Sequence, residues 1–337
     1  MTAEKSWIEK HDGMVLAKTG AWHGLGVVVE EAPTPYQALH LAGMNWEVGT
    51  CPLYGLVENE GSAEPTRVVY ENRFGLYRKD VNVMLGNCSE HYVPIQNIQV
   101  ADLIYDVAQT EDIKVESAGS LKNGQRIFFL VQLGSMGLQN GDDVIKQYAL
   151  FHSGHDGRTG LSVRQTNIRV VCANTERLAM RDSSIKLRHM GENAYDLNAI
   201  RAKLGDIKAQ ALEFEKTMEK AIQTEWDFNM LNEYFIKTYK DGTVSGLPTN
   251  TESRAYKTFE KTLATWHDYA SKHEHQANCF GTAYAGYQAV TQYASHDMHV
   301  RKRANVDAIQ ARNLNTLFGK GDALGSAASK NLVKLLG

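Results

Sequence analysis

Residues 114–172 hold the pattern that most constrains the fold, because four apolar segments follow one another with short polar turns between them. The expected strands cover 114–121, 126–133, 144–153 and 161–172. Asn123-Gly124 separates the first two strands, and this dipeptide is a strong hairpin signal because both residues accept the positive φ angles of a tight turn. Strands joined by such short turns pair antiparallel, so the region predicts a β-meander.

Helical patterns lie on both sides of the meander. Thr34-Pro35-Tyr36-Gln37 has the order of a capping box with Pro at the first helical position, and Asn97 can begin a second helix. After residue 196, apolar residues recur at alternating steps of four and three, a heptad seam that predicts one long helix. The seam consists of Ile200, Leu204, Ile207, Ala211, Phe214, Met218 and Ala221.

Further helices are expected near 254–273 and 277–297, and a short one is expected to begin at Asn174-Thr175. Together these patterns predict an α+β protein, with an antiparallel β-meander sheet packed on helices and a mainly α-helical C-terminal half. We expect a mixed α+β domain over 1–192 and a helical region over 193–337 that ends in a basic C-terminal tail.

Composition limits the classes of protein that remain. The 337 residues carry 36 basic and 39 acidic side chains, a net charge of −3, which excludes a uniformly basic nucleic-acid coat. No apolar run reaches the roughly 18 residues that cross a bilayer, so we expect no membrane partner. The first residues lack the hydrophobic core of a secretion signal. The four cysteines form no CxxC pair, which favours reduced thiols and a cytoplasmic location.

The charges are distributed unevenly along the chain. Residues 151–190 hold seven Lys or Arg against three Asp or Glu, and residues 296–337 hold the same numbers. Residues 51–120 hold eleven acidic against five basic side chains. The near-neutral total therefore conceals two basic segments and one acidic segment, and each could face a different partner.

The basic segments supply candidate phosphate ligands, because an arginine fork binds two phosphate oxygens at once. In a regular strand Arg164 and Arg169 lie on opposite faces. Phe151, Tyr148 or Tyr92 could stack on bases. The predicted nucleic-acid-binding residues are Arg158, Arg164, Arg169, Lys186, Arg188, Lys320, Lys330 and Lys334, the last three acting from a mobile tail. The alternative is a solvated sheet face with ordinary surface arginines.

A metal site is a weaker candidate. His152, His155 and Asp156 place three usable ligand types within five residues, as zinc or manganese would need. No obvious fourth ligand accompanies them, and His155-Asp156-Gly157 also fits a plain turn in which Asp156 bonds its own backbone. The chain contains no phosphate-binding loop, nucleophile elbow or HExxH motif, so we assign no catalytic residue and expect no cofactor.

Eight short strings of sequence carry a family resemblance: Trp22–Gly26, Ala42–Val48, Tyr92–Asn97, Ala118–Leu121, Ser153–Gly157, Arg169–Thr175, Gly281–Tyr284 and Asn315–Gly319. Together they resemble one family of phage, prophage and plasmid proteins of unknown function. They occur in the same order from about residue 20 to residue 320. The resemblance implies a mobile-element protein that acts in a bacterial cytoplasm, but the family provides no catalytic motif to transfer.

We therefore expect a non-catalytic protein of a phage or plasmid that binds nucleic acid, in particular single-stranded DNA, during replication or recombination. The heptad seam also leaves a homo-oligomer open. The first alternative is an interaction protein whose acidic segment 51–120 inhibits a host defence or host enzyme. The second alternative is a metal-dependent nuclease that uses His152, His155 and Asp156.

Overall fold

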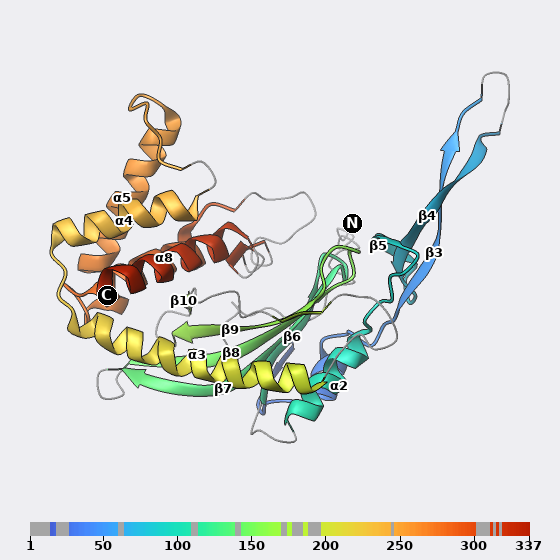
Figure 1. The fold of residues 1–337 in the computed structure, drawn as a ribbon, viewed down its shortest axis with the longest axis horizontal. Helices are drawn as coiled ribbons and strands as arrows, with labels where there is room; N and C mark the ends of the chain where they lie inside the picture. Colours follow the sequence, from blue (N-terminus) through green and yellow to red (C-terminus); the bar gives the residue numbers. More distant parts are fainter. Residues whose placement is uncertain are drawn as a thin grey trace, which may run out of the picture.

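The computed structural model describes most of the chain and shows an α+β protein whose large sheet connects a helical half to a projecting β-ribbon (Figure 1). The described residues are 14–17, 27–59, 64–108, 114–138, 143–169, 174–176, 185–187, 197–243, 246–300, 311–312, 315–316 and 319–337. Within these ranges no helix is long and apolar enough to cross a bilayer.

The large sheet has the strand order β10-β9-β8-β7-β6-β1-β2, with β11 also paired to β9. Every pair in it is antiparallel except β1 with β2. Its strands are β1 (Met14–Ala17), β2 (Val27–Val29), β6 (Lys114–Leu121), β7 (Arg126–Leu138), β8 (Asp143–Gly154), β9 (Leu161–Arg169), β10 (Asn174–Glu176) and β11 (Ile185–Leu187). The predicted meander is thereby confirmed as β6 to β9.

Two local predictions differ from the structure. The Asn123-Gly124 turn is a four-residue loop between Leu121 and Arg126, in which Lys122, Asn123 and Gly124 all have positive φ angles. The helix expected at Asn174-Thr175 is wrong, because these residues form β10 and pair with Ile168 and Arg169 of β9. Pairing along a neighbouring strand outweighs a capping signal that is only two residues long.

A second, three-stranded sheet has the order β3-β4-β5 and consists of β3 (Val48–Val57), β4 (Thr66–Arg78) and β5 (Val83–Ser89). The outer half of the β3–β4 ribbon extends beyond β5 and projects from the body (Figure 1). Helix α1 (Pro35–Leu41) begins with the predicted capping box, in which the Thr34 hydroxyl accepts from the Gln37 N–H. Helix α2 (Asn97–Ala108) also begins where the sequence predicts it.

One hydrophobic core lies between the large sheet and the helices on one of its faces. Phe129, Phe151 and Val163 lie side by side on β7, β8 and β9 and pack in the same cluster as α1 and α2. Ile207 of α3 (Leu197–Gln223) joins this cluster, and Gln147 donates to the Ala211 carbonyl at 3.3 Å. This side of the sheet is called the helix-covered face below.

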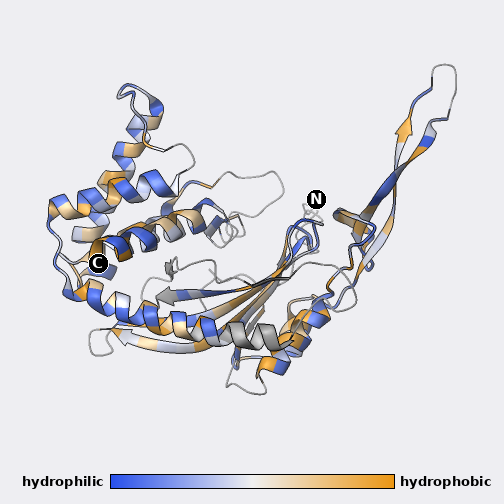
Figure 2. Ribbon diagram, in the orientation of Figure 1, coloured by the Kyte–Doolittle hydropathy of each residue, from blue (hydrophilic) through white to orange (hydrophobic). Residues whose placement is uncertain are grey.

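The C-terminal half is helical, and a second core holds it together. It contains α4 (Phe228–Gly242), α5 (Arg254–Lys272), η2 (Glu274–Gln276), α6 (Ala283–Gln292), η3 (Tyr293–Asp297) and α8 (Lys320–Leu336). Phe214, Met218 and Ala221 of the predicted heptad seam are buried in this core, so the described part of the seam packs within its own chain. Figure 2 shows hydrophobic and hydrophilic residues alternating along these helices, as a one-sided core requires.

The C-terminus differs from the mobile tail that we expected. Residues 320–336 form α8, and Leu324, Ala328 and Leu332 of this helix are buried in the second core. The Tyr234 hydroxyl donates to the Ala328 carbonyl at 3.0 Å and fixes α8 to α4. Small and apolar residues at helical spacing outweigh the basic charge that suggested a tail.

Candidate functional site

The face of the large sheet opposite the helix-covered face places a few charged side chains among buried apolar ones, since Phe128 and Leu150 on it are at most 1% exposed. Cross-strand partners share a face, so Phe128 and His152 lie on it together, as do Leu150 and Arg164. Arg126, two residues before Phe128, belongs to the same face. We call this surface the cationic face and define it by Arg126, His152 and Arg164.

Three strand cations on or beside this face have carboxylate partners. Arg126 lies 3.4 Å from Asp156, and Arg164 lies 3.1 Å from Asp322 at the start of α8. Lys146 of β8 lies 3.3 Å from Glu116 of β6. Arg164 is only 16% exposed and Asp322 23%, so this pair is screened less than an ordinary surface pair. The surplus positive charge comes from the exposed Arg158 and Lys320.

His152 is a neutral histidine among these cations. Burial lowers its pKa to about 3, and the positive charges of Arg126 and Arg164 act in the same direction. A neutral imidazole allows both arginines to remain close together, whereas an imidazolium would add a third positive charge to the same buried place. The protonation state of His152 therefore depends on the charges of Arg126 and Arg164.

The turn between β8 and β9 fixes Arg158 at the edge of the cationic face. Asp156 accepts hydrogen bonds from the backbone N–H groups of Arg158 and Thr159 at 2.9 and 2.8 Å. Partial burial alone would raise the pKa of Asp156, but these hydrogen bonds outweigh it and hold the pKa below its usual range. Gly157 has φ +75° and its Cα approaches the Asn87 carbonyl so closely that a Cβ would clash. Asp156 thus bonds the backbone of its own turn, which is the alternative to a metal site that the sequence offered.

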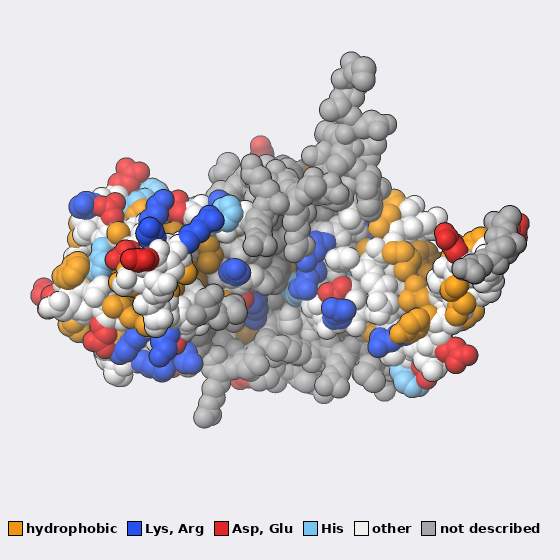
Figure 3. Space-filling model, turned by 90° about the horizontal axis from the view of Figure 1, so that it is seen from above, with side chains coloured by type: hydrophobic (Ala, Val, Ile, Leu, Met, Phe, Trp, Pro, Cys, Tyr) orange, Lys and Arg blue, Asp and Glu red, His pale blue; other side chains and the backbone are white. Residues whose placement is uncertain are grey.

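The structure brings some predicted binding residues together and separates others. Arg164 meets the start of α8 through Asp322, two residues after Lys320, whereas Arg158 lies in the β8–β9 turn; Figure 3 shows Lys and Arg side chains in the middle of the molecule. Lys186 lies opposite Ser162 in the β11–β9 pairing, and Arg169 lies opposite Ile145. Arg188 lies outside the described residues.

Lys330 and Lys334 belong to a different part of the surface. They lie ten and fourteen residues after Lys320 on α8, about 15 and 21 Å further along the helix axis. Nearby, Lys220 donates to the carbonyl of Gly337 at 3.2 Å, which places this end of α8 against α3. These two lysines are therefore not part of the cationic face.

The aromatic side chains that we expected to stack on bases are not available for it. Phe151 is 1% exposed and belongs to the core on the helix-covered face, and Tyr148 is fully buried. Burial, together with the Glu116 carboxylate, raises the pKa of Tyr148. Tyr92 is partly buried with its hydroxyl 3.5 Å from the Gly154 carbonyl. A ligand of this face would have to be held through charge and hydrogen bonds.

The weak metal candidates occupy different environments. The His155 ring nitrogen Nε2 lies 2.8 Å from Asn97 Oδ1, and the ring packs edge-on against Trp46. Asp156 is engaged in its own turn, as described above. Among the residues that the structure describes, no group of three or more His, Cys, Asp or Glu side chains could hold a metal ion.

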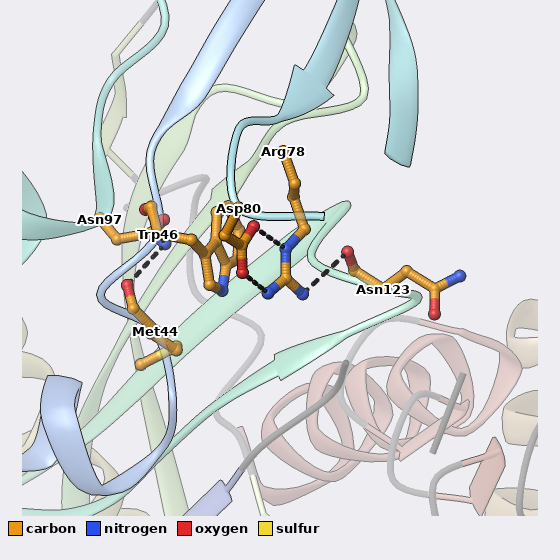
Figure 4. Close-up of polar contacts among 6 residues, drawn as sticks. All are labelled: Met44, Trp46, Arg78, Asp80, Asn97 and Asn123. Atoms are coloured by element: carbon orange, nitrogen blue, oxygen red, sulfur yellow. Dashed lines mark hydrogen bonds and ion pairs between the residues drawn. The ribbon is translucent and has the colours of Figure 1, made fainter. Parts of the chain in front are cut away.

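A buried junction around Trp46 attaches the ribbon to the sheet, and the sequence interpretation missed it (Figure 4). The guanidinium of Arg78 lies 4.4 Å from the centre of the Trp46 ring and pairs with Asp80 at 2.7 Å. It also donates to the Asn123 carbonyl in the β6–β7 loop at 3.4 Å. Asn97 donates to the Met44 carbonyl at 2.9 Å. Ribbon, helix α2 and sheet are thus joined at one point.

A signal for this junction was present in the sequence. Three of the strings that carry the family resemblance, 42–48, 92–97 and 153–157, meet here through Trp46, Asn97 and His155. The spacing of those strings along the chain gives no indication that they touch. Arg78 lies in none of them, so its buried position could not be read from the sequence.

The fold and the site define an α+β protein with a cationic sheet face between a helical half and a projecting ribbon. By sequence, the chain belongs to the family described as domain of unknown function (DUF932), which matches residues 84–316. The match begins in β5, so the whole of the β3–β4 ribbon lies before it. No curated protein matches the chain. No solved structure matches it either.

Proposed function

We propose that this protein binds nucleic acid, preferentially as a single strand, through the phosphate backbone and without catalysing a covalent step. The proposal includes the role that the family resemblance implies, in replication or recombination of a phage or plasmid inside a bacterial cell. An annealing factor needs to neutralise phosphates while it leaves the bases free to pair. It needs no general acid, general base or metal ion.

The observation that supports the proposal is the pair of Arg164 with Asp322, two residues after the exposed Lys320, on the sheet whose β8–β9 turn carries the exposed Arg158. The Arg164 guanidinium donates to one Asp322 carboxylate oxygen at 3.1 Å, and its fork is suited to two oxygens of a phosphate. A phosphate can therefore replace Asp322 as the partner of Arg164. The exposed Arg158 and Lys320 then add charge at the edges of the same surface.

The burial of the sheet's aromatic side chains supports a contact with the backbone of the nucleic acid rather than with its bases. Phe128, Tyr148 and Phe151 are each at most 1% exposed, so none of them offers a stacking platform. Binding through phosphates alone predicts little sequence preference and a strong dependence on salt. Both properties suit a protein that coats or anneals strands of any sequence.

Fluorescence anisotropy with labelled single-stranded and double-stranded DNA tests the proposal at about 50 mM and about 200 mM salt. The expected result is tighter binding to the single strand, with an affinity that falls steeply as salt rises. Arg158→Ala combined with Lys320→Ala should weaken binding at least tenfold and reduce the slope of the salt dependence by about two. Both side chains are exposed, so the variant should fold normally.

Lys330→Ala combined with Lys334→Ala is the matched control, because it removes the same amount of charge from a part of α8 that lies away from the cationic face. This variant should bind DNA within about twofold of the parent. Equal losses in both variants would mean that only net charge matters, and the cationic face would not be the binding site. Absence of binding to either DNA at low salt would overturn the proposal.

A protein partner is the second candidate function, and a separate observation favours it. The acidic segment 51–120 contains the ribbon, whose exposed side chains include Tyr54, Leu56 and Tyr70. A surface that combines negative charge with exposed apolar groups suits another protein and repels phosphate. Capture of one stoichiometric host enzyme, with no affinity for DNA, would support this reading.

A further inference from the structure

Among the described elements, none packs on either side of the outer half of the β3–β4 ribbon. We call it the arm and define it as residues 54–57 with residues 66–70. Strand β5 pairs with β4 only from Arg73 onward, so the arm is a ribbon of two strands. All of its described residues are exposed (Figure 1). An isolated two-stranded ribbon is only marginally stable in water. A partner that covers the arm would therefore stabilise it.

Both faces of the arm are apolar. The pairing places Tyr54, Leu56 and Val69 on one face, and the alternation of strand side chains places Val57, Val68 and Tyr70 on the other. These six side chains are 48% to 64% exposed, and they are a third of the eighteen large hydrophobic side chains that are exposed in the described part of the chain. A strand that is apolar on both faces is typical of one covered on both faces.

The strands of the arm carry one charged side chain, Arg67, and the glutamates that flank them in the sequence select the class of partner. Residues 53–72 contain Glu58, Glu60, Glu64 and Glu71 against the single cation Arg67, a net charge of −3. The Arg67 guanidinium lies 3.9 Å from the centre of the Tyr54 ring, on the same face of the ribbon. A polyanion is repelled by such a surface, whereas a basic protein surface attracts it.

The opposite end of the same molecule offers a groove with one cation in its lining. The corner between α4 and α5 is hollowed and lined by Tyr239, Gly246, Pro248, Arg254, Ala255 and Thr258. Outside the lining, Lys261 is exposed two turns after Arg254 on the same face of α5, and Leu247 beside the groove is 38% exposed. Helix α5 carries four basic and two acidic side chains. The sign of this helix's charge is opposite to that of residues 53–72, and the lining of the groove is partly apolar.

We propose that the arm of one molecule docks into the α4–α5 groove of a second copy of this chain. The arm and the groove lie at opposite ends of the molecule, so an arm cannot reach the groove of its own chain (Figures 1 and 3). Two different surfaces then meet at each contact, which is a head-to-tail interface. Repetition of such a contact forms a closed ring or an open filament.

The Trp46 junction gives the arm a fixed direction. Arg78 lies at the inner end of β4 and is bound at once to Trp46, Asp80 and the β6–β7 loop. Gln96 at the start of α2 also bonds both the N–H and the carbonyl of Val48, the first residue of β3. A ribbon held at its base in this way loses less entropy on docking than a free loop would.

Sedimentation velocity on the full chain, after removal of nucleic acid with nuclease, tests the proposal. The parent protein should sediment at a mass several times that of one chain, and the mass should rise with concentration. Leu56→Asp combined with Val69→Asp on the arm should give the mass of a single chain. Arg254→Glu combined with Lys261→Glu in the groove should do the same. Leu212→Asp on α3 changes an equally exposed leucine elsewhere and should leave the assembly unchanged.

Mixing the two variants distinguishes head-to-tail docking from every other arrangement. The arm variant retains a groove and the groove variant retains an arm, so an equimolar mixture should form a species of twice the single-chain mass and nothing larger.

Unchanged melting temperatures would show that all variants are folded. The proposal is overturned by a parent that remains single at all concentrations, by an arm variant that still assembles, or by a groove variant that still assembles. A parent that stays single but captures a host protein would assign the arm to that partner instead. None of these outcomes depends on DNA binding by the cationic face.

Discussion

The His152 side chain is only 5% exposed and is affected by the charges of two arginines. Its burial and the two positive charges both disfavour protonation of the ring. Burial disfavours the charged ring, and Arg126 and Arg164 disfavour it further, so the pKa falls to about 3. His155, three residues later, is fully buried too, but its ring nitrogen Nε2 lies 2.8 Å from Asn97 Oδ1 and its ring packs edge-on against Trp46. Two histidines of similar burial therefore have different roles, one electrostatic and one structural.

The lowered pKa of His152 predicts how stability depends on pH. In the unfolded chain this histidine takes up a proton below its ordinary value of 6.5, whereas the folded protein takes it up only near pH 3. Stability is therefore fully present above pH 6.5 and is lost as the pH falls towards 3. His152→Gln should remove about 2 kcal/mol of the loss that the parent shows between pH 7 and pH 5. Urea unfolding at the two pH values measures this difference, and equal losses in both proteins would contradict it.

The loop between β6 and β7 shows how one element supports another. Gly124 has φ +94°, and a Cβ at this position would lie 2.7 Å from the Trp46 ring. The loop can therefore pass the indole only because residue 124 has no side chain. The Asn-Gly pair predicted the turn, but its tightest constraint comes from a tryptophan 78 positions earlier in the chain.

Gly124→Ala should destabilise the protein by about 2 kcal/mol, because it adds both a strained φ angle and a clash with Trp46. Gly55→Ala is the matched control, since the structure shows no atom within 4 Å of a Cβ there and an ordinary φ angle. Its effect should stay within about 0.5 kcal/mol. Thermal and urea unfolding of both variants measure the difference. Similar stability of the two variants would show that the loop adapts without cost.

Elements with local signals were predictable, and the contacts between distant elements were not. The Thr34-Gln37 capping box, the β6–β9 meander and the buried part of the seam from Ile207 to Ala221 each follow from residues that are near one another in sequence. Helix α4 was missed although its buried residues Leu231, Tyr234, Phe235 and Thr238 follow a helical period and Asp227 caps its first turn. Strand β4 continues through Asn72, whose φ of +58° interrupts the local pattern without ending the strand.

The candidate site shows the same division. The basic segment near Arg158 and Arg164 was visible as charge, and strand alternation separated Arg164 from Arg169. Phe151 and Tyr148 were assigned to base stacking although they lie in the interior, because sequence does not tell which face of a strand is covered. The junction of Trp46 with Arg78 depends on a contact between separate elements, and no local pattern encodes it.

At the scale of the whole molecule, one ion pair connects the sheet to the helical half on the cationic face. Arg164 and Asp322 are 158 residues apart in the sequence and 3.1 Å apart in space. The pair stabilises the contact between β9 and α8 by at most about 1 kcal/mol, since both side chains are partly exposed. Its greater consequence is for binding, because Asp322 occupies the arginine that the proposed function assigns to phosphate.

Asp322→Asn removes this competing charge while it keeps the shape of the side chain. The variant should bind single-stranded DNA about three- to tenfold more tightly than the parent. Arg164 loses the competing charge of Asp322, and the carboxylate no longer repels phosphate. The slope of its salt dependence should increase by about one phosphate contact. Anisotropy titrations at several salt concentrations measure both quantities.

The companion variant Arg164→Ala with Asp322→Ala removes the pair together and leaves neither charge unmatched. Its net charge equals that of the parent, so any loss of affinity reports on Arg164 itself rather than on total charge. We expect binding below that of the parent and far below that of Asp322→Asn. If Asp322→Asn and the double variant instead bind alike, Arg164 does not contact the nucleic acid, and the carboxylate acts only through long-range repulsion.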